Sequence, residues 1–127
     1  MVVKQLIKKI DFYNYNYRLN LNYAMIGNYK IVTLCGSTRF RDEFISVQKQ
    51  LTLEGNIVIS VGLFGHSGDT EVWTEKTKEM LDDMHLRKID LADEIFVINP
   101  GGYIGESTRG EIDYAEKNNK KVTYLVK

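Results

Sequence analysis

The chain has 127 residues, which is enough for one domain with a buried core and too few for two. Its 17 basic and 17 acidic residues give a formal net charge of zero. No overall charge favours binding to a nucleic-acid polymer or to an anionic membrane surface, so we expect a small-molecule partner instead.

The single cysteine, Cys35, excludes an intrachain disulfide and a multi-cysteine metal site, and it fits a reducing compartment. No apolar run approaches the ~18 residues that a membrane-spanning helix needs. The sequence therefore predicts a cytoplasmic protein that does not enter a membrane.

Residues 1–29 differ in composition from the rest of the chain. They contain the Asn- and Tyr-rich stretch "DFYNYNYRLNLNY", which keeps neither a helical nor a strand period. Two interpretations stay open. The segment is either a disordered or accessory extension, or the natural start lies at Met25. The folded domain is predicted over residues 30–127.

From residue 30 onward, β-rich runs alternate with helical patterns. The β-rich runs predict four strands, at residues 30–35, 56–62, 94–99 and 121–126. The helical spacing predicts three helices, at about residues 40–51, 72–92 and 107–117. Nearly continuous apolar strands separated by helices predict an α/β fold, a Rossmann-like or flavodoxin-like three-layer sandwich with a small parallel sheet.

In such a fold, the carboxyl ends of the strands meet at one edge of the sheet, and ligands bind there. The loop after the first strand, "GSTR", offers the backbone N–H groups of a helix start, the hydroxyls of Ser37 and Thr38, the guanidinium of Arg39, and a small residue at Gly36. These groups suit a phosphate or a carboxylate. The alternative is that Ser37 or Thr38 only caps the helix.

The loop after the third strand, "NPGGYIGESTRGE", repeats this combination. Gly105, Ser107 and Thr108 lie at a helix start, Glu111 follows one turn later, and Tyr103 is a candidate for stacking on a base. As an alternative, a hydroxyl caps the helix and Glu111 complements its positive end. That account explains each residue separately, but it does not explain why two such loops are found at one edge of the sheet.

The segments "KIVTLCGSTRF", "LADEIFVINP" and "GESTRGEIDYA" resemble the nucleoside 2-deoxyribosyltransferase superfamily, including its nucleotide N-glycosidase branch and small members from bacteria and phages. The resemblance covers roughly residues 30–126. The positions that match the family's motifs are Gly36, Ser37 and Arg39, then Ala92 and Asp93, then Ser107, Gly110 and Glu111.

This resemblance implies an enzyme that cleaves or exchanges the N-glycosidic bond of a nucleoside or nucleoside 5′-monophosphate. Glu111 would attack the sugar, with Asp93 as a further catalytic residue. It also implies a homo-oligomer whose subunits complete each other's sites. With two histidines and no ligand-spaced motif, we expect no metal and no cofactor.

One position departs from the family's pattern. Eight residues before Asp93 the family usually carries an aspartate, whereas this chain has His85. A histidine there could act as an acid near neutral pH or position the sugar, or it could be a partly exposed helix residue. Asp82 and Asp83 lie close enough to supply a carboxylate.

Two other functions stay open. The chain could be a module that binds a nucleotide-derived ligand without catalysis, or an enzyme acting on another ribosyl link, such as that of a dinucleotide. The sequence does not identify the base or the sugar.

Overall fold

The computed structural model describes residues 27–127. Most of the segment 1–29, with its two interpretations, therefore lies outside the described residues. Within residues 27–127, no helix is both long enough and apolar enough to cross a lipid bilayer.

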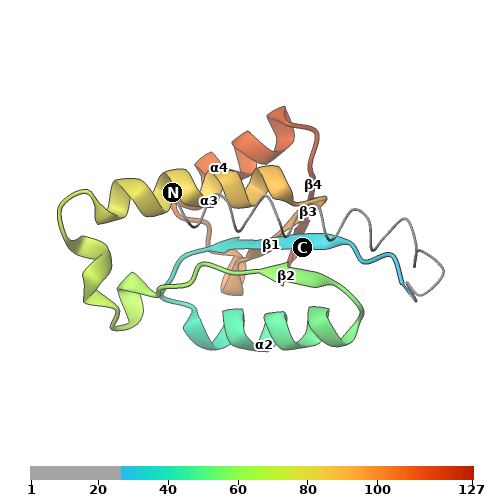
Figure 1. Cartoon of the computed structure of the whole chain (residues 1–127). Coiled ribbons are helices and arrows are strands. Elements are labelled where there is room, and N and C mark those ends of the chain that lie inside the picture. The colour runs from blue at the N-terminus through green and yellow to red at the C-terminus, as the bar shows by residue number, and fades with distance from the viewer. Residues whose placement is uncertain (1–26) are drawn as a thin grey trace, which may run out of the picture.

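The described residues form a parallel sheet covered by helices on both faces. The strands are β1 (Ile31–Gly36), β2 (Ile57–Ile59), β3 (Glu94–Ile98) and β4 (Lys121–Tyr124). They are ordered β2-β1-β3-β4, and every neighbouring pair is parallel. Figure 1 shows α2 (Arg41–Leu53) on one face and α3 (Thr77–Leu91) with α4 (Glu106–Lys117) on the other. The predicted three-layer α/β fold is confirmed.

Each face of the sheet packs its own core, because alternate side chains of a strand point to opposite faces. Leu34 of β1 and Ile98 of β3 pack with Phe44 and Val47 of α2. On the other face, one cluster joins strand residues to α3 and α4. Its members are Cys35, Ile89, Ile95, Val97, Ile112 and Ala115. Cys35 therefore points toward α3 and α4 and away from α2.

The second strand is shorter than predicted. Only Ile57 to Ile59 pair with β1. The next carbonyl, that of Ser60, accepts a hydrogen bond from Lys88 Nζ at 2.9 Å. The Ser60 carbonyl thus bonds to the Lys88 side chain of α3 and not to a neighbouring strand. The chain leaves the sheet before residue 62.

The second predicted helix, 72–92, is broken. A 3₁₀ turn over Thr70–Trp73 comes first, and α3 begins only at Thr77. Lys76, between them, has a left-handed backbone with φ of 69°. Such a conformation is uncommon for a residue other than glycine and cannot continue a right-handed helix.

The strand order changes the direction of the chain crossings at the neighbouring strands β1 and β3. The chain crosses from β1 to β2 over the α2 face and from β3 to β4 over the opposite face (Figure 1). The loop after β1 therefore leads to one face of the sheet and the loop after β3 leads to the other face, although the two strands are neighbours. Ligands in open parallel sheets bind at this point, outside the carboxyl ends of the strands.

Candidate functional site

A cavity of about 280 Å³ lies at the carboxyl ends of β1 and β3. All but one of the site residues predicted from the sequence line it. These are Gly36, Ser37, Thr38, Arg39, His85, Tyr103, Gly105, Ser107, Thr108 and Glu111. The two hydroxyl-rich loops, distant in the sequence, therefore face one cavity.

Asp93 is the exception. Its carboxylate accepts a hydrogen bond from the Ile31 backbone N–H at 2.8 Å, and its own N–H donates to the Ile31 carbonyl at 2.9 Å. Both residues lie at the amino ends of β1 and β3, at the edge of the sheet away from the cavity. The assignment of Asp93 as catalytic is therefore wrong; it ties β3 to β1.

The structure requires a glycine at position 36 because of strand packing and not because of a ligand. A Cβ atom built there would lie 2.7 Å from the carbonyl oxygen of Ile98 and 2.9 Å from its Cβ. Gly36 and Ile98 are paired positions of β1 and β3. The glycine lets the end of β1 lie against β3, and this fixes where the following loop begins.

The loop after β1 is held by the loop after β2. The Thr38 hydroxyl is 2.8 Å from His66 Nδ1 and also accepts the His66 backbone N–H at 3.1 Å. The Ser67 hydroxyl donates to the Thr38 carbonyl at 2.8 Å. His66 in turn packs edge-on against Trp73, whose indole N–H donates to the Gly65 carbonyl. Thr38 is thus a structural link as well as a lining residue.

Ser37 and Arg39 form a separate polar group at the mouth of the cavity. Arg39 Nε donates to the Ser37 hydroxyl at 3.0 Å, and the Arg39 guanidinium carbon lies 4.6 Å from the centroid of the Tyr103 ring. The first residue of α2 is preceded by Phe40, and no side chain caps this helix. The alternative role of Ser37 or Thr38 as a helix cap is therefore not what the structure shows.

The start of α4 faces the cavity in the same uncapped state. The residue before the helix is Gly105, and no described side chain hydrogen-bonds to the first-turn N–H groups. Ser107 and Thr108 lie inside the first turn and do not cap it. These N–H groups and the positive end of the helix are available to an anion in the cavity.

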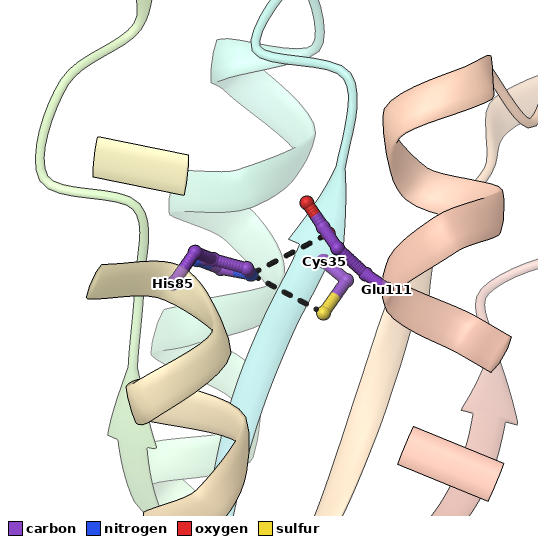
Figure 2. A group of neighbouring side chains, drawn as sticks. All are labelled: Cys35, His85 and Glu111. Atoms are coloured by element: carbon purple, nitrogen blue, oxygen red, sulfur yellow. Dashed lines mark hydrogen bonds and ion pairs between the residues drawn. The ribbon is translucent and has the colours of Figure 1, made fainter. Parts of the chain in front are cut away.

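Three side chains from three elements converge beneath this helix start. Figure 2 shows Cys35 of β1, His85 of α3 and Glu111 of α4 pointing toward one another. His85 Nε2 is 3.5 Å from Glu111 Oε2 and 3.3 Å from Cys35 Sγ. The side chains of His85 and Glu111 are only 10% and 20% exposed, and Cys35 is fully buried.

Burial dominates the ionisation of this cluster. It raises the pKa of Glu111 to about 7, with the nearby Asp82 charge adding to the effect. It lowers the pKa of His85 to about 4, helped by the charge of Lys88. It also raises the pKa of Cys35 well above its ordinary value, together with the neighbouring Glu111. In each case the charged form loses hydration that the protein does not fully replace.

These values bear on one expectation. With its pKa lowered to about 4 by burial, His85 is mostly neutral at physiological pH, which disfavours a role as the proton donor. It is also not a partly exposed surface residue, because α3 buries it against β1 and α4. A positioning role for His85 is the remaining prediction.

Further residues line the cavity beside those assigned to the site from the sequence, and they include Asp82, which was expected to lie within reach. Lys78 and Asp82 form an ion pair of 2.7 Å on the α3 wall, and Trp73 and His66 line the cavity too. The sequence excludes Cys35 from an intrachain disulfide and from a multi-cysteine metal site, and it does not assign Cys35 to the ligand site. Its place directly before Gly36, at the end of the first strand, was the one available sign that it lies near the site.

No protein-family model matches this chain, and no curated protein matches its sequence significantly. What the protein does must therefore be inferred from the cavity itself.

Proposed function

We propose that the protein cleaves or exchanges the N-glycosidic bond of a nucleoside or nucleoside 5′-monophosphate, with Glu111 as the nucleophile. One observation carries the proposal. The largely buried Glu111 carboxylate faces the same cavity as two anion-binding groups, the uncapped start of α4 and the loop that ends in Arg39. An acid beside anion-binding groups is understandable when one ligand presents an anion at one end and an electrophilic carbon at the other.

A nucleotide has this distribution of charge. Its 5′-phosphate and its anomeric carbon lie on opposite sides of the sugar ring, so the phosphate can contact N–H groups and a guanidinium while C1′ faces a carboxylate. The Tyr103 ring, 42% exposed, and Trp73, 49% exposed, offer flat surfaces to the base or sugar. Of the described arginines, only Arg39 lines the cavity, and its guanidinium lies over Tyr103.

The chemistry follows from the carboxylate. A Glu111 oxygen forms a bond to C1′, the bond from C1′ to the base nitrogen breaks, and the base leaves with the electron pair and takes up a proton. Water then attacks C1′ of the sugar ester and releases the sugar and the Glu111 carboxylate. A second base attacking in place of water gives exchange. Only the ionised form of Glu111 can begin this sequence.

His85 supports the proposal as a positioning residue. Its Nε2 lies 3.5 Å from the buried Oε2 atom of Glu111. A neutral imidazole packed against the carboxylate restricts its movement without neutralising it. The carboxylate is then oriented and keeps the negative charge that attack on C1′ requires.

The test is release of free base from a panel of nucleosides and nucleoside 5′-monophosphates, followed by chromatography. Glu111→Gln should keep the fold and release almost no base, because an amide cannot form the sugar ester. The matched control is Glu116→Gln, an exposed position on the same helix that does not line the cavity. Its activity should equal that of the wild type.

Two results would contradict the proposal. Near-normal base release by Glu111→Gln would show that Glu111 is not the nucleophile. Tight nucleotide binding with no base release from any substrate would identify a binding module instead. Dinucleotides are added to the panel as well. Base release from a dinucleotide alone would identify an enzyme that acts on another ribosyl link.

A further inference from the structure

The cluster of Cys35, His85 and Glu111 has the geometry of a chelate. Each residue supplies one donor atom, and the three atoms all lie within 4.8 Å of one another. The Sγ to Nε2 distance is 3.3 Å and the Nε2 to Oε2 distance is 3.5 Å. A tetrahedral zinc ion with ordinary bond lengths places neighbouring donor atoms about 3.4–3.6 Å apart. The two separations from His85 Nε2 are close to this spacing, and the third, from Cys35 Sγ to the Glu111 carboxylate, is within 4.8 Å.

The same cluster is poorly arranged for a cysteine-histidine-carboxylate relay. Such a relay uses both imidazole nitrogens, one facing the nucleophile and the other facing the carboxylate. Here a single atom, His85 Nε2, faces both Cys35 and Glu111 (Figure 2). The Cys35 thiol is also fully buried and does not line the cavity, so it has no access to a substrate.

We propose that Cys35 Sγ, His85 Nε2 and Glu111 Oε2 together bind a zinc ion. One thiolate, one imidazole and one carboxylate form a donor set that suits zinc and does not suit magnesium or calcium, which prefer oxygen ligands alone. His85 and Glu111 line the cavity, so a fourth coordination position opens toward it. Within residues 27–127, this is the only group of three such donors brought together.

Charge balance favours the same ion. Zinc binding displaces the protons of the Cys35 thiol and the Glu111 carboxyl and leaves two negative charges in a buried place, where each would be costly without a counterion. A doubly charged cation makes the centre neutral. Glu111 Oε2 is in addition a buried oxygen with no hydrogen-bond partner among the described residues. A metal ion would satisfy that oxygen.

This site goes beyond the proposed function and has a consequence for it. Zinc would occupy the carboxylate that the proposed reaction needs as a free nucleophile. Zinc binding should therefore switch base release off, and removal of zinc should restore it. Zinc binding itself requires no substrate, so it can be measured even if the proposed reaction is wrong.

The first experiment uses protein dialysed against EDTA and then titrated with zinc in competition with a chromophoric chelator. We expect one zinc ion per chain. Cys35→Ala, His85→Ala and Glu111→Gln should each weaken binding by more than the ~10–100-fold typical of losing a partner outside the coordination sphere. The matched control is His66→Ala, which removes the other histidine that lines the cavity and should leave zinc affinity unchanged.

Cobalt(II) provides a measurement that needs no substitution. Cobalt bound to the wild-type chain should show a thiolate-to-metal charge-transfer band and the strong visible bands of tetrahedral coordination. Circular dichroism checks that each variant is folded. The proposal is overturned if the wild type binds no zinc, if cobalt shows no thiolate band, or if only His66→Ala weakens binding. Unchanged base release in an active enzyme at saturating zinc would equally overturn the assignment of Glu111 as a ligand.

Discussion

His85 Nε2 of α3 lies 3.5 Å from Glu111 Oε2 of α4, and burial shifts the pKa values of the two groups in opposite directions. The pKa of His85 falls to about 4 and that of Glu111 rises to about 7. Between these values both groups are uncharged. Above a pH of about 7 the pair consists of a carboxylate and a neutral imidazole, which is the form that the proposed reaction uses.

The rate of base release should therefore rise with pH as Glu111 ionises. With EDTA present to keep the cluster metal-free, kcat/KM should increase about tenfold per pH unit well below 7 and level off above it, because it reports the pKa of the free enzyme. A set of initial rates from about pH 5 to 9 tests this. A profile that is flat across this range, or that falls with rising pH, would contradict the assignment.

The stability of the protein should show the same ionisation without any substrate. The folded pKa of Glu111, about 7, is above its ordinary value of 4.5, so the folded state holds the proton more tightly than the unfolded state. Its stabilising contribution is complete below pH 4.5 and is lost as pH rises through 7. Across this window the wild type should lose on the order of 3 kcal/mol of unfolding free energy relative to Glu111→Gln.

Urea denaturation of both proteins at a series of pH values measures this difference. His85 is present in both, and its contribution has the opposite sign: with a folded pKa of about 4 against 6.5, it is present above pH 6.5 and lost as pH falls through 4. Comparing the two proteins therefore isolates Glu111. Parallel stability curves for the two proteins would mean that Glu111 titrates normally.

Arg39→Ala should weaken binding of a nucleoside 5′-monophosphate much more than binding of the matching nucleoside, because the guanidinium would contact only the phosphate. Arg41→Ala is the matched control. Arg41 is two residues away in the sequence, lies over Phe64 and does not line the cavity. Isothermal titration with the two ligands gives the comparison. Equal losses of affinity for the nucleotide and the nucleoside would show that Arg39 does not recognise the phosphate.

His85→Ala should reduce turnover and move the rising limb of the pH profile to lower pH. The reason is that water entering the vacated space would rehydrate the Glu111 carboxylate and lower its pKa toward 4.5. His85→Asp should retain part of the activity. Parallel melting curves separate this positioning effect from misfolding. If His85→Ala keeps both its turnover and its pH profile, His85 does not position the carboxylate.

Gly36→Ala should lower stability by ~1–3 kcal/mol, because the new Cβ would lie 2.7 Å from the Ile98 carbonyl oxygen at the carboxyl ends of the two central strands. Gly110→Ala is the matched control. Nothing lies within 4 Å of a Cβ at Gly110, which is inside α4, so alanine there should stabilise the helix by ~0.5–1 kcal/mol. Melting temperatures that change in the same direction would contradict this account of Gly36.

The sequence determined the fold and most of the cavity wall. Continuous apolar strands separated by helical patterns require a parallel sheet with two covered faces, and parallel strands bring the loops after β1 and β3 to one edge. Local sequence rules also placed Glu111 one turn into α4. These features depend on residues near one another in the chain, where the periodicity of side chains is direct evidence.

Only the tertiary structure decided what each polar residue does. The family resemblance suggests Asp93 as a catalytic residue, yet Asp93 precedes β3 and accepts a hydrogen bond from Ile31 at the amino ends of the strands, opposite the cavity. Cys35, His85 and Glu111 are separated by tens of residues and meet only because β1, α3 and α4 pack on one face. Their pKa values follow from that packing, since burial by neighbouring elements is not encoded in any local pattern.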